Sequence, residues 1–482
     1  MTQDDLEAAA AAIVEGGLAV GNLAELHGRL GACFGRVEPF QQSWKYMVGL
    51  MSDLPRKNAW TIAEHAGDAT PYRMQRLLGR AVWDTDTAMA VVRGFVAERL
   101  ADQPLRVAAL DETGQEKQGA LTAGVKRQYM GCAGKVANGV NTVHCSYATP
   151  NGHALIGARI YIPTEQLDDP TRRAAMGIPA ETVFRTKPQL AIDITTDAIT
   201  EGVMPPWCAG DEVYGRSSEL RRHLETHRVG YVLRVGAAFH LTLPTRQKIR
   251  VDAMAAKHLK ARKHWQVCSV TGSKGERAYA WAWTATRSAN HYLLIRKHLQ
   301  TGELAYHYCH IPTGQPVTLM ALVKVACLRW PVEEDFEFGK DHFGLDHSQA
   351  RTYTALLRHT VLAMAALAVC AVTAAQAKTR ASAPILPTTP DEQPPQDCGL
   401  SPSPSPRSNA CSTSPPADYN PKPTTCIGPG GDADTKPAPA GSTTAPDYVA
   451  NQQQHDQINK YYCRTSQGHA PSLTREDQPR SS

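Results

Sequence analysis

Three acidic residues stand where the chain could place catalytic carboxylates. Asp111 ends the apolar run RVAALD and is followed by the turn residues Glu112–Gly114, and Asp211 ends a second apolar run, WCAGD. Glu333 lies in a predicted helix that begins near Pro331, a residue tolerated in the first turn of a helix. Carboxylates at two strand ends, with a third on a facing helix, can converge on divalent metal ions.

Such a set would suit phosphodiester chemistry. Mg²⁺ needs hard oxygen ligands and keeps several waters, so a few carboxylates suffice to hold it. Two ions roughly 3.5–4 Å apart would activate a water and stabilise the leaving oxygen. The alternative is structural, because an Asp at a strand end is more often a turn-former or a helix cap than a ligand. Composition and spacing alone leave open whether the three carboxylates meet.

The elements that must position these residues follow from periodicity. From Leu105 onward, short apolar or alternating runs closed by Gly, Pro, Asn or Asp predict strands. Helical patterns follow at 187–201 and 217–227, and strands before and after helices predict an α/β core. Residues 229–310 are β-rich again, and a helical region resumes near 317 and runs to about 378.

Residues 1–100 are predicted to be helical, because apolar residues recur there at helical spacing. Basic residues occur together with the aromatic residues Trp60 and Tyr72 between these helices. The bases are Arg56, Lys57, Arg73, Arg76 and Arg80. Helices with exposed bases suit contact with the DNA backbone, and a solvated basic face explains them equally well.

Composition narrows the class of protein. The chain has 482 residues, 42% of them hydrophobic, and a net charge of +5, which permits a nucleic-acid partner without demanding one. Twelve scattered cysteines without a C-x-x-C pair indicate reduced cytosolic thiols. The acidic N-terminus lacks the basic region of a signal peptide, and the alanine-rich run Thr360–Ala377 favours a buried helix over a membrane span. We therefore expect a soluble, cytoplasmic protein.

The last part of the chain differs in composition. Of 33 prolines, 18 lie in residues 376–482, and Pro, Ser, Thr and Gly predict a disordered tail over 379–482. The abrupt switch to SPSPSPRSNACSTSPP is typical of translation out of frame. Under that hypothesis, another frame after codon 398 encodes a helix-forming, basic segment, which resequencing and translation of the gene would reveal.

Several motifs occur in order along the chain. They are LMSDLPRKNAW, EHAGDATPYRMQRLLGRAVWD, LDETGQEKQGALTAGVKRQYMGCAGKVANG, GDEVYGRSSELRRHL, RWPVEEDFEFGKDHFGLDH and LRHTVLAMAALAV. Over roughly residues 30–378 the chain resembles the IS701-type transposases, which belong with the IS4-like DDE transposases of bacterial insertion sequences. The resemblance implies an RNase H-like catalytic core at 101–378, with Asp111, Asp211 and Glu333 as its DDE triad and two Mg²⁺ or Mn²⁺ ions.

The related signature around the glutamate is Tyr-x2-Arg-x3-Glu-x6-Lys. Arg329, Glu333 and Lys340 fit that spacing, whereas Ala326 stands at the tyrosine position. The resemblance implies that Arg329 and Lys340 contact phosphates near the metals. Helical spacing divides this helix into an apolar stripe that suits packing on a sheet and a polar stripe that can face a cleft. The stripes are Val332, Phe336 and Phe343, and Glu333, Glu337 and Lys340.

Other residues are expected to meet DNA. Tyr214 and Arg216 closely follow the second aspartate, Asp211. Four basic residues that follow the first aspartate, Asp111, could contact backbone phosphates. These bases are Lys117, Lys126, Arg127 and Lys135. The stretch 229–310 is similar to the β-strand insertion of IS4-like transposases. Its tryptophans, Trp265, Trp281 and Trp283, could stack on a displaced base or pack in the core.

The function implied by the resemblance is cut-and-paste transposition. The enzyme would hydrolyse one strand at each element end, and the 3′-hydroxyl would then attack target DNA. Its partners would be double-stranded DNA, namely terminal inverted repeats and target, and a second copy of the chain in a synaptic complex at the bacterial nucleoid, with residues 1–100 as a DNA-binding domain. The rival is a catalytically inactive or regulatory DNA-binding remnant. The triad and the Arg–Lys pair favour the enzyme, and the tail favours the rival.

Overall fold

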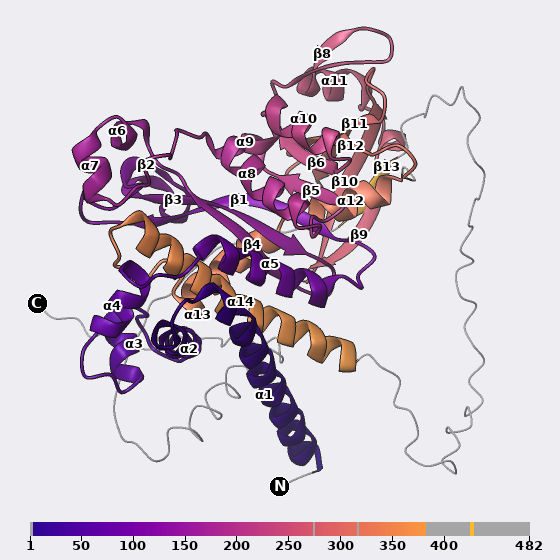
Figure 1. The fold of residues 1–482 in the computed structure, drawn as a ribbon. Coiled ribbons are helices and arrows are strands. Elements are labelled where there is room, and N and C mark those ends of the chain that lie inside the picture. Colours follow the sequence, from indigo (N-terminus) through magenta and orange to yellow (C-terminus); the bar gives the residue numbers. More distant parts are fainter. Residues whose placement is uncertain (1–2, 273–274, 316–317, 382–424, 429–482) are drawn as a thin grey trace, which may run out of the picture.

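The structure, a computed structural model, describes residues 3–272, 275–315, 318–381 and 425–428 (Figure 1). Most of the predicted tail, and with it the out-of-frame hypothesis, lies outside the described residues. Within that tail the structure describes the end of the last long helix and strand β13 (Thr425–Gly428), which pairs antiparallel with strand β10 (Gly275–Ala285).

Helices precede the sheet, as predicted for residues 1–100. They are α1 (Gln3–Leu30), α2 (Val37–Met51), α3 (Ala59–His65), α4 (Tyr72–Gly79) and α5 (Thr85–Leu100). Side-chain caps fix two of their starts, since Asn58 accepts backbone N–H groups at α3 and Asp84 does so at α5. These helices pack around α14 (Tyr353–Ala381), and their apolar side chains share one core with the sheet.

A mixed sheet runs through the molecule. Its first strands are β1 (Val107–Glu116), β2 (Lys126–Met130), β3 (Lys135–Ala148), β4 (His153–Ile160), β5 (Trp207–Gly210) and β6 (Gly230–Val235). Along the order β4-β3-β1-β5-β6, neighbouring strands are antiparallel from β4 to β1 and parallel from β1 to β6. Strands that alternate with helices around one sheet confirm the predicted α/β class.

Most strands of the β-rich stretch continue the same sheet beyond β6, whereas β7 (His240–Thr242) and β8 (Lys248–Arg250) pair only with each other in a separate two-stranded sheet. The stretch also contains α11 (Val251–His258), β9 (Gln266–Gly272), β10, β11 (His291–His298) and β12 (Leu304–His310). Strand β12 pairs with β6, and β11, β10 and β9 follow outward. Trp281 is buried, and Trp265 and Trp283 are partly buried against apolar clusters, which favours the core alternative for these side chains.

Helices cover both faces of the sheet. Besides α11 and α14, the helices after β1 are α6 (Thr164–Leu167), α7 (Pro170–Ala175), α8 (Lys187–Thr200), α9 (Glu212–Gly215), α10 (Ser218–Thr226), α12 (Leu319–Cys327) and α13 (Pro331–Phe343). Helix α8 packs close to Gly157 of β4, and α13 contacts the His144 ring of β3. Gly157 pairs with Cys145, the neighbour of His144, so α8 and α13 lie on opposite faces.

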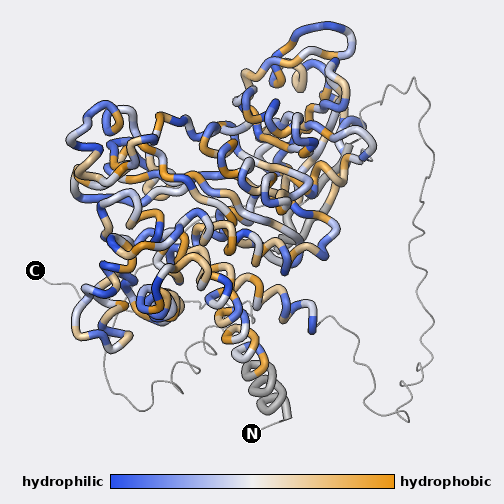
Figure 2. The backbone as a smooth tube through the Cα atoms, in the orientation of Figure 1, coloured by the Kyte–Doolittle hydropathy of each residue, from blue (hydrophilic) through white to orange (hydrophobic). Residues whose placement is uncertain are grey.

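Helix α14 is long and apolar enough to cross a membrane, but 94% of its most hydrophobic stretch is buried inside the protein. Hydrophobic residues run along most of the helix, with hydrophilic residues at its C-terminal end (Figure 2). Its neighbours are α1, α2, α5 and β4. The prediction that the alanine-rich run forms a buried helix is confirmed.

Candidate active site

Asp111 lies in the middle of β1. The strand continues to Glu116, and Glu112–Gly114 pair with β3 instead of forming the predicted turn. The prediction that Asp111 ends its strand is therefore wrong. The physical reason is that β3 pairs with the whole length of β1, so turn-prone residues are held in an extended backbone.

Asp211 directly follows β5, as predicted, and the parallel register brings it beside Asp111. Leu110 of β1 is the partner of Gly210 of β5, so the next residue on each strand is an aspartate. Asp211 also caps the short helix α9, where its Oδ1 accepts the backbone N–H of Val213 at 2.8 Å. The two alternatives for this residue, helix cap and site carboxylate, are therefore compatible.

The third carboxylate, Glu333, comes from α13. The apolar stripe of this helix is buried, as predicted, at Val332, Phe336 and Phe343. Arg329, one turn before Glu333, joins the two acids. Its Nη2 atom lies 3.2 Å from Asp111 Oδ2 and 3.4 Å from Glu333 Oε1. The predicted arginine of the signature thus lies inside the carboxylate cluster.

The electrostatics of the site reflect carboxylates gathered around one guanidinium. Burial raises the pKa of Asp111 to about 8; Arg329 opposes this shift, and Glu333 and Asp211 add to it. Burial, followed by the charge of Glu112, also raises the pKa of Asp211. The Oδ2 atom of Asp111 is buried and receives no hydrogen bond from the described residues. Such an atom is unfavourable unless a cation compensates it, and the Arg329 guanidinium, 3.2 Å away, is the cation beside it. A buried carboxyl with a shifted pKa and one charged partner is typical of functional sites.

The donor set fits a divalent metal ion, although no ready-made centre is present. Among the described residues, no three His, Cys, Asp or Glu side chains are arranged to hold a metal ion. Carboxylate oxygens are nevertheless the ligands that Mg²⁺ prefers, and the Oδ2 atom of Asp111 is an acceptor that no hydrogen bond from the described residues occupies. Asp111, Asp211 and Glu333 are the residues that could hold it. In the described arrangement Arg329 supplies the positive charge between Asp111 and Glu333.

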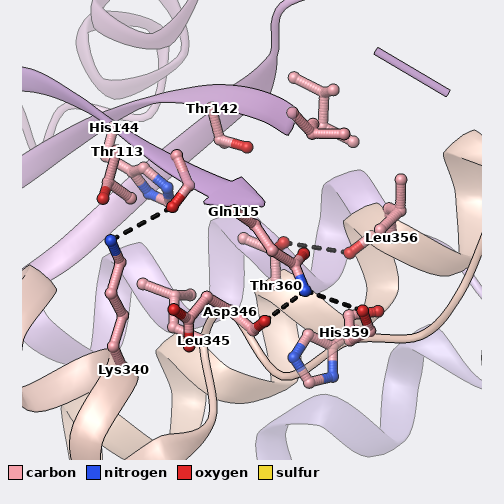
Figure 3. Close-up of a pocket in the computed structure, with 14 residues that line it drawn as sticks. Thr113, Gln115, Thr142, His144, Lys340, Leu345, Asp346, Leu356, His359 and Thr360 are labelled. Carbon is pink, nitrogen blue, oxygen red and sulfur yellow. Dashed lines mark hydrogen bonds between the residues drawn. The ribbon is translucent and has the colours of Figure 1, made fainter. Parts of the chain in front are cut away.

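Lys340 lies two turns after Glu333 and reaches back to the sheet. Its Nζ donates to the carbonyl oxygen of Gly114 in β1 at 3.2 Å (Figure 3). It borders a cavity of about 30 Å³, room for a few waters but not for a nucleobase. Other residues that line the cavity are Thr113, Gln115, His144, Asp346 and His359. Lys340 and, through Arg329, Glu333 thus lie toward β1, whereas Glu337, the third member of the polar stripe, is exposed.

His144, which the sequence did not single out, is the cross-strand partner of Asp111. The ring is buried, packs on Phe336 of α13, and has an Nδ1 atom without a hydrogen-bond partner in the described part of the chain. Burial, with a contribution from Lys340, lowers its pKa to about 3. His144 is therefore neutral, and it lines the cavity without adding charge.

Buried Tyr214 and half-buried Glu112 form a hydrogen-bonded pair behind the aspartates. Tyr214 is fully buried and donates its hydroxyl to Glu112 Oε2 at 2.9 Å, while Lys187 donates to Glu112 Oε1 at 2.5 Å. Burial, then Glu112, raises the pKa of Tyr214 well above its ordinary value. The structure thus places Tyr214 beneath the site and not on its surface. Sequence reasoning missed Glu112 because its partners lie 75 and 102 residues away.

The basic residues that were predicted to contact DNA fall into two groups, exposed side chains and side chains that are engaged with the protein. Several are exposed, namely Arg127, Lys135 and Arg216, together with Arg56, Arg73, Arg76 and Arg80 near α3 and α4. Lys126 pairs with Glu165 at 2.5 Å, and Lys117 is partly buried and donates to the Ser348 carbonyl at 2.6 Å. Lys57 is only 4% exposed, so its assignment to the exposed bases is wrong. Its ammonium group donates hydrogen bonds to backbone carbonyls, a tertiary contact that sequence periodicity could not reveal.

A second ionic cluster lies on α13, beside the site. Asp335 is buried and accepts hydrogen bonds from Ser146 Oγ at 2.5 Å and His153 Nδ1 at 2.9 Å. His153 Nε2 lies 3.3 Å from Glu334. Burial alone would lower the pKa of His153, but Asp335 and Glu334 outweigh it and raise that pKa to about 10. This cluster anchors α13 to β3 and β4.

Two known transposases show similarity to this chain. A curated protein of Microchaete diplosiphon, named as a probable transposase for insertion sequence element IS701, is 26% identical over 216 residues, which cover 43% of this chain and 52% of the relative. The chain therefore spans about half the length of that relative. A solved structure of the piggyBac transposase synaptic complex with hairpin DNA aligns at 9% identity and a TM-score of 0.39, over 76% of this chain and 78% of that one. That score is too low to assign a shared fold.

The chain also matches a family of known proteins. The family described as DDE superfamily endonuclease matches residues 29–288, a segment that contains Asp111 and Asp211 and ends before Glu333. With the similarity to the IS701 transposase, it confirms the resemblance found in the sequence motifs. Since the match covers more than half of the chain, the protein belongs to the DDE superfamily endonuclease family.

Proposed function

We propose that this chain is a transposase that binds the ends of an insertion sequence and cuts and joins DNA with Asp111, Asp211 and Glu333. The observation that carries the proposal is the approach of Asp111 from β1 and Glu333 from α13 to one Arg329 guanidinium. The parallel register of β1 and β5 adds Asp211 beside Asp111. The strand order around β1, antiparallel on one side and parallel on the other, supports the RNase H-like core that the resemblance implies.

Each site residue has a role in this proposal. Asp111, Asp211 and Glu333 would hold two Mg²⁺ or Mn²⁺ ions, which would supply water activation and charge stabilisation at the phosphodiester. Arg329 and Lys340 place positive charge beside the carboxylates, where phosphate oxygens of the DNA would lie. Phosphoryl transfer depends mainly on such positioning and charge stabilisation.

In this proposal the DNA lies along the exposed basic side chains. Residues 1–100 would contact backbone phosphates through α3 and α4, where Trp60 and Tyr72 are exposed beside the arginines. Residues 101–378 carry the chemistry, with 229–310 as an insertion, and Arg127 and Arg216 extend the contact surface. Lys117 and Tyr214 would support the site from behind, since both are engaged with the protein. Two copies would pair the inverted repeats before they join target DNA.

The test is to incubate the protein with its own element ends and Mg²⁺ or Mn²⁺. Nicks at the element boundary, followed by joined products, are expected. The rival function is that of a regulatory remnant. It is supported by the Arg329 guanidinium, which lies among the carboxylates where a metal would be held. That rival predicts end binding without any nick at either metal.

Binding of element ends should weaken steeply with salt, because the proposed contacts are mostly to phosphates. Neutralising about five phosphates predicts a slope near −4.5 in log K against log salt concentration. Fluorescence anisotropy of a labelled end, titrated at several salt concentrations, measures this slope. A slope shallower than about −1 would mean that DNA is not the main partner.

Lys340→Ala should reduce cleavage and joining by about tenfold to a hundredfold, because it removes a charge beside the site while the carboxylates stay in place. Lys340→Arg keeps the charge but changes its shape, so partial recovery would point to charge and none to a specific geometry. Joined products on a gel provide the measurement. If Lys340→Ala cleaves and joins like the parent, Lys340 is ordinary surface and the extended signature does not apply.

A further inference from the structure

Lys57 is a buried cation held by backbone carbonyls. Its Nζ donates to the carbonyl oxygen of Leu50 at the end of α2, at 2.8 Å, and to that of His342 in the last turn of α13. Its own backbone N–H donates to His347 Nδ1 at 3.1 Å. Burial lowers the pKa of Lys57 to about 8, and the exposed Asp53 nearby opposes the shift. The ammonium group of Lys57 therefore reaches His342, 285 positions further along the chain.

The contact suits the chemistry of helix ends. The last carbonyls of a helix have no partner within it, and a cation there also interacts favourably with the helix dipole. The approach is close, since a Cβ on Gly344, which ends α13 with a φ of +62°, would lie 2.7 Å from the Cβ of Lys57. A buried ammonium that lost these carbonyls would be strongly unfavourable, so Lys57 fixes the end of α13 against α2.

A second contact ties the same corner. The hydroxyl of Tyr46, on α2, lies 2.8 Å from His359 Nδ1, and His359 Nε2 lies 2.9 Å from the carbonyl oxygen of Gly344. Tyr46, His359 and Gly344 are all on helices or helix ends, and Tyr46 and His359 are buried. The end of α13 is thus bound to α2 through side chains as well as through packing.

We propose that Lys57 is a positioning residue that sets the orientation of α13, and with it Glu333 and Lys340. This inference rests on the proposed function for the identity of the reaction. A helix is a stiff rod, so fixing its last turn limits rotation at Glu333, about two turns away. Lys57 also precedes Asn58, the cap of α3, so the proposed DNA-contacting helix and the catalytic helix share one anchor.

The test compares Lys57→Met with Arg358→Met. Arg358 is a matched control, because it is also a buried cation on backbone carbonyls. Its partners are the carbonyls of Leu77, Leu78, Ala81 and Trp83 and the hydroxyl of Thr85, and none belongs to α13. Three quantities are measured for each variant: hydrogen exchange of the peptide over 331–347, single-turnover cleavage of element ends, and the Mg²⁺ concentration for half-maximal cleavage. Cleavage is normalised to the folded fraction.

For Lys57→Met we expect exchange in 331–347 to accelerate by about tenfold or more, cleavage to fall about tenfold, and the half-maximal Mg²⁺ concentration to rise severalfold. End binding should stay within about threefold of the parent. Arg358→Met should lose stability yet leave exchange in 331–347 and the Mg²⁺ requirement unchanged. If Lys57→Met does not fold, Tyr46→Phe, which removes one hydroxyl from the same corner, should show a smaller change of the same sign.

Parent-like exchange and parent-like Mg²⁺ dependence in Lys57→Met would overturn the inference, as would equal changes in Arg358→Met. Failure of the proposed function looks different. In that case the parent itself leaves its element ends uncut, while the exchange contrast between the two variants still decides whether Lys57 holds α13.

Discussion

Asp111→Asn, Asp211→Asn and Glu333→Gln should each lower strand cleavage by at least about a thousandfold while end binding stays within about threefold of the parent. Each exchange removes one charged oxygen donor at nearly constant volume. Stability should not fall with activity, because burial raises the pKa of Asp111 and the fold therefore disfavours its charge. Cleavage gels, anisotropy and thermal melts on the same samples separate these effects.

The matched control is Glu337→Gln, which makes the same exchange on α13 one turn beyond Glu333, at an exposed position. It should cleave like the parent. Near-parental cleavage by any one of the three variants removes that residue from the triad. A loss of end binding equal to the loss of cleavage would instead mean that the carboxylates support folding or DNA docking.

His153→Ala should destabilise the fold by about 3 kcal/mol near pH 6, since it leaves the buried Asp335 carboxylate without its cationic partner. The effect depends on pH in a defined direction. Because the pKa of His153 is raised to about 10 in the folded chain, its stabilisation is complete below about pH 6.5 and is lost as pH rises towards 10. The parent and the variant should therefore converge in stability at alkaline pH.

Urea unfolding of both proteins at pH 6, 8 and 10 measures this convergence. His227→Ala, at an exposed histidine, is the control and should differ little from the parent at each pH. A stability difference that stays constant from pH 6 to pH 10 would show that His153 acts through packing and not through its charge.

What could be foreseen from the sequence was local. Apolar spacing placed Glu333 on a helix that buries Val332 and Phe336, and a strand followed by Gly and Asp placed Asp211. The meeting of Asp111 with Asp211 depends on strand order, which periodicity does not contain; the family resemblance supplied it. The end of β1 was misplaced because its pairing partner, β3, overrides the turn-forming preference of Glu112–Gly114.

The residues that sequence reasoning assigned wrongly, or missed, have distant partners. Lys57 was predicted to be an exposed basic residue, yet it is buried and donates to a carbonyl oxygen 285 residues away. Asp335 stood unnoticed beside Glu333, although His153, 182 residues earlier, makes it part of an ionic cluster. Charge alone predicts a solvated side chain, and only tertiary structure shows which charges are enclosed and compensated.

The continuity of the sheet across β6 and β12 bears on how this protein can be divided, by evolution or by a protease. If residues between β6 and α12 were removed, β6 would become an edge strand with a row of unpaired N–H and C=O groups. Such an edge recruits strands from other molecules, so a trimmed catalytic half should aggregate. The β-rich stretch thus also serves as a shield, and a lineage that acquired or lost it would have had to seal that edge in the same step.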